Sequence, residues 1–196
     1  MITKGTRASR RLEFFKGYNT LKTKASVSHV PRYMYHQHRD WTDHIACLRT
    51  LLSYCIPEVP KEDDIIQRYR ISLGMKYSAD IREWNFLEQY AVDVRYGCIE
   101  TRIDFDDILK MLQDDYFVMM QTMINYSHWV VLCGYYCLDE NDIERNKVLY
   151  YCPYYDEIRL TNADEFIEMW VDGAYVNSHV RNDFVAVRDK NGVDNY

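Results

Sequence analysis

The feature that most constrains the fold is the order of hydrophobic patterns along the chain. Apolar residues recur at helical spacing through 41–54, and the Pro-containing segment PEVP at 57–60 ends that helix. In the second half of the chain, short runs rich in β-branched and aromatic residues take over, as in HWVVLCGYYC at 128–137. Helices followed by strands are typical of an α+β fold with a mainly antiparallel sheet.

The same patterns predict where the remaining elements lie. Further helices are expected at 61–72, 78–90, 104–114 and 163–171. Asn162 is expected to cap the last of these helices. Strands are expected at 92–99, 116–123, 128–137, 147–152 and 183–188.

The length of 196 residues suits one domain with a full-sized core, which we place at 27–196. Residues 1–26 carry charge and little apolar periodicity, and they are expected to form a basic N-terminal extension. The composition includes eighteen Tyr, seven Phe and four Trp. Because Tyr joins a large apolar ring to a wettable hydroxyl, this content favours a protein with an extensive contact surface.

Charge is distributed unevenly along the chain. Residues 1–24 hold seven Lys or Arg and one Glu, a net charge of +6, so the rest of a chain with formal net charge −6 carries −12. The segment is either a solvated tail or an arm that docks on an acidic partner, and we predict the second. The residues expected to contact that protein are Arg7, Arg10, Arg11, Phe14, Phe15 and Tyr18.

The cysteines and the N-terminus point to a cellular location. Six cysteines lie within apolar or aromatic runs without the dense spacing of a disulfide framework, which indicates free thiols in a reducing compartment. The N-terminus has no apolar region typical of a secretory signal, and no stretch approaches the ~20 apolar residues that span a bilayer. We therefore expect an intracellular protein without a membrane partner, in the cytoplasm or a cytoplasmic assembly.

Three segments carry residues whose types and spacing suggest a catalytic constellation. His29-Val30-Pro31 is followed by Gln37 and then by WTDHIAC at 41–47, which opens the first helix. The segment SHWVVLCGYY at 127–136 places a His at the start of a buried strand. The segment VLYYCP at 148–153 is a strand that ends just before a Pro.

This arrangement resembles a eukaryotic family named for a guanylyl cyclase domain. That family is similar to papain-like cysteine peptidases, notably the peptidase domain of bacteriocin-exporting transporters, and the resemblance covers about residues 28–188. It implies a papain-like fold with a nucleophilic cysteine at the head of the first helix. It also implies an upstream Gln for the oxyanion, a His base on a later strand, and an Asn or Asp before a Pro that orients the His.

The chain departs from this pattern at two of the four positions. Gln37 matches the oxyanion residue and His128 matches the base, but Asp43 stands at the nucleophile position and Cys152 at the orienting position. The resemblance thus leaves a vestigial site, in which Asp43 is expected to pair with a protonated His128. Cys47 matches a second, packing cysteine of the family, and both Cys47 and Cys152 are expected to be ordinary buried thiols.

The expected function is therefore binding: a catalytically degenerate domain that acts as an interaction or structural subunit of a larger assembly. The alternative is an active enzyme, either a thiol-peptidase-like hydrolase or a guanylyl cyclase as the family name suggests. Against the cyclase, Asp104, Asp106 and Asp107 fit a helix N-terminus, and a chain with seven Gly shows no Gly-rich phosphate cradle.

No cofactor, metal or nucleic-acid partner is expected. Two groups of residues were weighed as metal ligands, since His-x-His on a strand and paired cysteines are both ligand patterns. Neither pattern is strengthened by further ligands at suitable spacing. The two groups are His36, His38 and His44, and Cys133 and Cys137.

Overall fold

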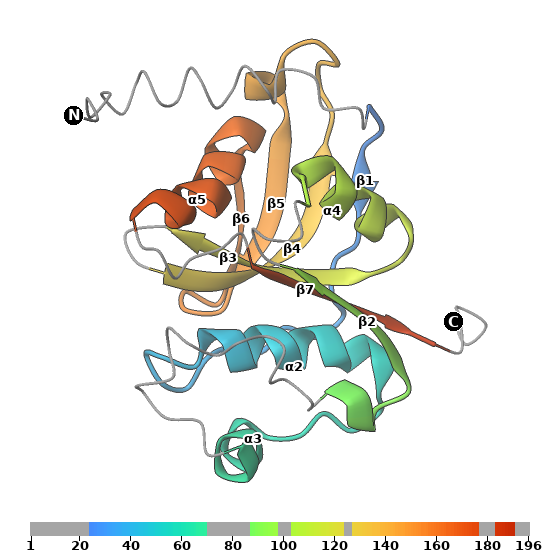
Figure 1. Ribbon diagram of the computed structural model, residues 1–196, viewed down its shortest axis with the longest axis vertical. Coiled ribbons are helices and arrows are strands. Elements are labelled where there is room, and N and C mark those ends of the chain that lie inside the picture. Colours follow the sequence, from blue (N-terminus) through green and yellow to red (C-terminus); the bar gives the residue numbers. More distant parts are fainter. Residues whose placement is uncertain (1–23, 70–86, 98–102, 124–126, 177–182, 191–196) are drawn as a thin grey trace.

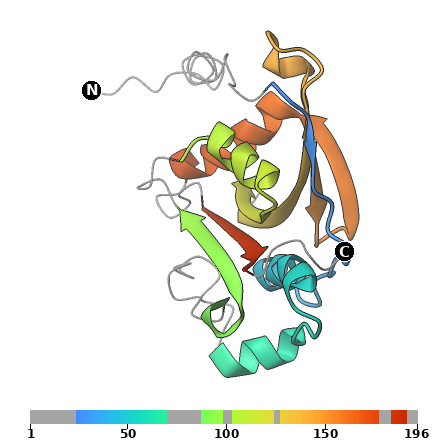
Figure 2. The same cartoon turned by 90° about the vertical axis from the view of Figure 1, so that its right-hand side faces the viewer.

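The computed structural model describes residues 24–69, 87–97, 103–123, 127–176 and 183–190. A sheet separates two helical layers (Figures 1 and 2). On one side lie α2 (Asp43–Cys55) and α3 (Glu62–Tyr69), and on the other lie α4 (Phe105–Gln113) and α5 (Ala163–Val176). The described residues thus form an α+β fold with four α-helices and a mainly antiparallel sheet, as the order of hydrophobic patterns predicted.

Seven strands make up the sheet in this part of the chain. They are β1 (Val27–Ser28), β2 (Val92–Gly97), β3 (Phe117–Met123), β4 (Ser127–Tyr136), β5 (Lys147–Cys152), β6 (Glu157–Asn162) and β7 (Phe184–Asp189). Their order is β2-β7-β3-β4-β5-β6, with β1 paired to β4, and each of these pairings is antiparallel. β4 is therefore the central strand that connects both halves of the sheet.

The β1–β4 contact depends on a glycine. β1 pairs with Gly134 and Tyr135, beyond the last β4 residue that pairs with β3. A Cβ atom on Gly134 would lie 3.0 Å from the carbonyl oxygen of Val27, closer than side chains normally come. The missing side chain at this position lets β1 approach β4 and holds the segment that leads to α2 against the sheet.

Alternating side chains of the central strands divide the interior into two hydrophobic clusters. In β3, Val118 and Met120 join the cluster beneath α4 and α5, whereas Phe117 and Met119 join the cluster beneath α2. This period of two is the one expected for a strand that is buried on both faces. The helix α2 is itself deeply enclosed, since its first ten residues are all buried.

Four of the five expected helices correspond to α-helices of the structure. The helix expected at 41–54 is α2, and those expected at 61–72, 104–114 and 163–171 correspond to α3, α4 and α5. Asp104 and Asp107 form a reciprocal capping box at the start of α4, which is the role that the sequence assigned to the acidic residues there. Most of the helix expected at 78–90 lies outside the described residues, and Leu87–Gln89 form a 3₁₀ turn.

Two strands were missed. β6 reads EIRLTN, with an even mixture of polar and apolar residues, and it pairs with β5 alone among the described strands. Asn162, which was expected to cap the last helix, is the last residue of β6 and directly precedes α5, and its side-chain oxygen accepts a hydrogen bond from Lys147. β1 has only two residues, too few for a sequence pattern.

The N-terminal arm lies almost entirely outside the described residues. Arg7, Arg10 and Arg11 belong to that part, as do Phe14, Phe15 and Tyr18, so their role stays a prediction. The described end of the extension contacts the body, because Lys24 pairs with Glu140 at 3.1 Å and Ser26 accepts a hydrogen bond from the backbone N–H of Cys137. Among the helices of the described ranges, none has both the length and the apolar character that a membrane crossing requires.

Candidate functional site

Asp43 is the first residue of α2, where a carboxylate is favoured by the helix dipole. Its side chain is almost fully buried, with a relative exposure of 3% for the residue. One carboxylate oxygen, Oδ2, accepts hydrogen bonds from His128 Nδ1 and from the backbone N–H of Trp129, both at 2.9 Å. The other oxygen, Oδ1, lies 3.5 Å from His44 Nδ1. The predicted pairing of Asp43 with His128 is confirmed.

His128 is the second residue of β4, and its imidazole has a different partner on each nitrogen. Nδ1 contacts Asp43, and Nε2 lies 3.2 Å from Sγ of Cys152. Because a carboxylate only accepts, Nδ1 carries a hydrogen. Nε2 therefore accepts from the thiol when the ring is neutral, and donates to the sulfur when the ring is protonated. The ring connects Asp43 and Cys152 into one chain of hydrogen bonds.

Cys152 is the last residue of β5 and is 1% exposed. The sequence placed it at the position that orients the His but gave it no chemical role. The structure instead brings its thiol against the nitrogen of His128 that faces away from Asp43. The arrangement is that of a Cys-His-Asp triad, in which Asp43 holds the imidazole and the thiol is the remaining member.

Charge interactions within this chain of hydrogen bonds shift all three pKa values. Burial opposes the charged form of each group, but the two histidines outweigh burial at Asp43 and hold the pKa of its carboxyl well below the usual range. Burial likewise lowers the pKa of His128, yet hydrogen bonds and charge from Asp43 and Cys152 raise it to about 9. His128 is therefore protonated at neutral pH, and the buried charges of Asp43 and His128 compensate each other.

The thiols of Cys152 and Cys47 differ in kind. Burial raises the pKa of Cys47 well above its ordinary value, and nearby acidic groups raise it further. Burial also acts on Cys152, but the hydrogen bond and charge of His128, with the backbone groups of Tyr155 and Tyr154, lower the pKa of its thiol below the ordinary value. Both thiols are buried, as expected, but only Cys152 lies against a histidine; how fast either of them reacts stays a prediction.

Gln37 reaches the same region through its backbone. Its N–H and the Nδ1–H of His36 both donate to the carbonyl oxygen of Pro153, at 3.3 Å and 2.8 Å, next to Cys152. The Gln37 side chain is 4% exposed, and its amide nitrogen donates to the carbonyl oxygen of Arg39 at 3.0 Å. One of the two hydrogens of that amide is therefore used, which leaves one for the oxyanion role that the resemblance implies.

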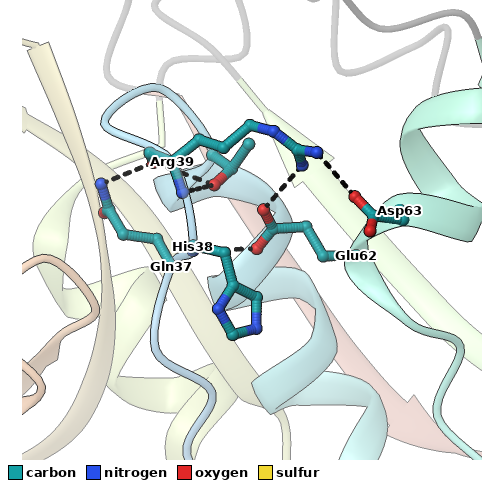
Figure 3. Close-up of polar contacts among 6 residues, drawn as sticks. Gln37, His38, Arg39, Glu62 and Asp63 are labelled. Atoms are coloured by element: carbon teal, nitrogen blue, oxygen red, sulfur yellow. Dashed lines mark hydrogen bonds and ion pairs between the residues drawn. The ribbon is translucent and has the colours of Figure 1, made fainter.

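The loop between Gln37 and α2 is fastened to α3 by ion pairs (Figure 3). The guanidinium of Arg39 contacts Glu62 at 3.3 Å and Asp63 at 2.7 Å, and Glu62 also accepts from the backbone N–H of His38. Glu62 is buried, so its contacts with Arg39 and His38 offset the cost of removing its charge from water. The sequence did not predict these ion pairs, which hold in place the loop that leads to Asp43.

Two aromatic side chains follow Cys152 in the turn between β5 and β6. The ring of Tyr154 stands perpendicular to that of His128, with 6.4 Å between the ring centroids, and it also packs edge-on against Tyr155. Tyr154 is 40% exposed. Its ring therefore packs next to the buried imidazole and also reaches the surface.

In the ranges that the structure describes, no three His, Cys, Asp or Glu side chains gather in an arrangement that could hold a metal ion. Of the histidines weighed as ligands, His36 and His38 lie with their ring centroids 6.3 Å apart, and His44 contacts Asp43. Comparison with known proteins adds no assignment: no protein-family model matches the chain, and the search of curated proteins finds no match.

Proposed function

We propose that the chain is a catalytically degenerate papain-like domain that acts as an interaction or structural subunit of a larger assembly, in an intracellular reducing compartment. The observation that carries this proposal is the state of Asp43 at the head of α2. Where the related peptidases hold a nucleophilic thiol, this chain has a buried carboxylate whose two oxygens are engaged by His128, Trp129 and His44. Attack of a carboxylate on an amide would give an anhydride, which is less stable than the amide.

The surface supports a binding role. Large apolar side chains are exposed on several elements, and such residues in groups are typical of protein contacts. Two of them, Ile158 and Leu160, are neighbours on the same face of β6, at 45% and 60% exposure. The other exposed large apolar residues of the described ranges are Val30, Tyr33, Tyr96, Leu138, Tyr154 and Tyr155.

A second candidate is thiol-dependent hydrolysis with Cys152 as the nucleophile, and the observation that favours it is the contact between Cys152 and His128. Two features weigh against it. The sulfur of Cys152, at the end of β5, is buried. The amide of Gln37, the expected oxyanion donor, already donates one of its hydrogens to Arg39. The cyclase suggested by the family name has less support, since Asp104 and Asp107 are engaged in capping α4.

The proposal is tested by recovery of partners from native extract. Three forms of the protein are compared: the full chain, the chain without residues 1–24, and the full chain with Ile158→Asp and Leu160→Asp. If the arm docks on an acidic surface, its removal should lower recovery of the same partner, and the remaining binding should depend less on salt, because exposed charges are screened over ~8 Å at physiological ionic strength.

The identified partner is then purified and titrated against the same three forms. Equal affinity for all three would show that neither the arm nor β6 carries the binding. If the purified protein alone hydrolyses acyl substrates, and Cys152→Ser abolishes this, the binding proposal gives way to the hydrolase.

A further inference from the structure

We propose that Cys152 is a peroxide-reactive thiol, which His128 activates and which hydrogen peroxide or a small alkyl hydroperoxide oxidises to a sulfenic acid. The proposal goes beyond the binding function and does not depend on it. It concerns the thiol of Cys152, on the side of His128 that faces away from Asp43. This thiol has no part in the proposed binding role.

The geometry provides the parts that this reaction needs. The sulfur of Cys152 lies 3.2 Å from His128 Nε2, and the opposite nitrogen is held at 2.9 Å from Asp43. Backbone groups of Tyr155 and Tyr154 add hydrogen bonds that favour the thiolate. A thiolate beside an imidazolium is the reactive form of cysteine, and here a buried carboxylate keeps the imidazolium charged.

The reaction is balanced within this set of groups. The Cys152 thiolate attacks one oxygen of the peroxide and forms an S–O bond, while the O–O bond breaks. The departing oxygen takes the proton from His128 Nε2 and leaves as water, or as an alcohol from an alkyl hydroperoxide. The sulfur is oxidised by two electrons, the peroxide is reduced by two, and His128 is left neutral and still bonded to Asp43.

The surroundings favour a peroxide over an acyl substrate. An acyl transfer needs donors for an oxyanion, and the Gln37 amide is bonded to Arg39. The backbone groups that follow Cys152 are directed to its sulfur. A peroxide needs no oxyanion site, and its small size lets it approach a sulfur that is 1% exposed more easily than an acyl substrate could.

The other cysteines serve as internal controls. Cys55 is more exposed than Cys152, yet burial raises its pKa to about 12. Cys133 is buried, as Cys152 is, and its pKa is likewise raised to about 12. If accessibility alone governed oxidation, Cys55 would react before Cys152. If His128 governs it, Cys152 reacts first.

The experiment uses the full-length protein under native conditions at pH 7. It is treated with hydrogen peroxide in the presence of dimedone, and the adducts are located and timed by peptide mass spectrometry. We expect Cys152 to be labelled at least about tenfold faster than Cys55, since the thiolate fraction changes tenfold for each unit of pKa. Preferential labelling of Cys55, or no labelling of Cys152, would overturn the proposal.

Two variants distinguish activation of the Cys152 thiol by His128 from access of the peroxide to that thiol. His128→Gln should slow labelling of Cys152 to the rate of Cys55, and Tyr154→Ala, which removes the ring next to the imidazole but leaves His128 in place, should accelerate it. If His128→Gln does not fold, the wild-type pH profile decides: Cys55 labelling should rise about tenfold per unit between pH 8 and pH 10, whereas Cys152 labelling should level off, because the pKa of its thiol is lowered.

Parallel slopes for Cys152 and Cys55 would show that His128 does not activate the thiol. Cys152-dependent turnover of an activated acyl ester would reassign the site to hydrolysis. Because purified protein is used without any partner, these outcomes are independent of the binding proposal.

Discussion

Two helices contact the sheet through different interactions. One contact is that of α5, and the other is that of the N-terminus of α2. Beneath α5, Phe166 and Trp170 are fully buried. Both pack against Phe105 of α4 with ring centroids about 6 Å apart, and Phe166 also packs against Tyr150 of β5 at 5.3 Å. At the start of α2, the ion pair of Asp43 and His128 joins helix to strand. Burial of aromatic rings is favourable in itself, whereas a buried ion pair must first offset the loss of hydration.

The difference teaches where chemistry is to be sought in this molecule. A hydrophobic contact tolerates changes that keep its volume, but a buried ion pair demands one geometry and one protonation state. The α5 contact therefore contributes mainly to stability, although Cys152 belongs to the same hydrophobic cluster as Phe166 and Trp170. The α2 contact couples stability to the ionisation of His128, and through it to the thiol of Cys152.

The largest effect is expected in the α5 contact. Phe166→Ala removes a fully buried ring that packs against Phe105 and Tyr150, and should lower the free energy of unfolding by about 3–5 kcal/mol in urea titrations. In the folded variant, Cys152 should still be labelled faster than Cys55. Leu138→Ala, at a residue that is 67% exposed, is the control and should change stability by less than about 0.5 kcal/mol. If Cys152 were no longer labelled faster than Cys55 in Phe166→Ala, the α5 contact and the α2 contact would not be independent.

The α2 contact should respond to a single charge. Asp43→Ala leaves His128 buried without its carboxylate, so the ring must either carry an uncompensated charge or lose its proton, at an expected cost of about 3 kcal/mol in the same titration. Asp43→Asn is the matched control, because it retains an acceptor for the N–H of Trp129 and should cost less. In either variant, the pKa of His128 measured by NMR should fall from about 9 towards its ordinary value. An unchanged histidine pKa would show that Asp43 does not hold the charge.

Acid should weaken the α2 contact selectively. The pKa of Asp43 is lowered in the folded state, so its contribution is present above the unfolded value of about 3.9 and is lost as the pH falls below it. The groups that lower it are His128 and His44. The loss should be about 1.4 kcal/mol for each unit by which the pKa is lowered. Denaturant midpoints between pH 5 and pH 3 should thus fall more steeply for the wild type than for Asp43→Asn, and equal slopes would contradict the assignment.

The smallest effect is expected at the start of α4. Asp104 caps this helix by accepting from the backbone N–H of Asp107 at 3.0 Å. Asp104→Ala should cost about 1 kcal/mol, and Asp104→Ser, which can still cap, should cost less. Thermal unfolding measures both. Neither should change the labelling of Cys152, because the cap acts on the first turn of α4 and leaves the contact of Cys152 with His128 in place.

The sequence alone determined the elements whose patterns are long and regular. The spacing of apolar residues in α2 fixed which side chains face the sheet, and the runs in β3, β4 and β5 identified the strands. The resemblance then placed Asp43 opposite His128, a pairing that the structure confirms. The helices and strands could be predicted because periodicity is a local property of the chain, whereas the pairing of Asp43 with His128 followed from the resemblance.

Only the tertiary structure decided what each nitrogen of His128 contacts. Cys152 is 24 residues from His128 along the chain, and the N–H of Trp129 is 86 residues from Asp43, so no local pattern records these contacts. The same holds for β6, whose mixed sequence becomes a strand because β5 pairs with it. A thiol's reactivity depends on the charges that folding brings within a few ångströms of it, and for Cys152 that charge is on His128.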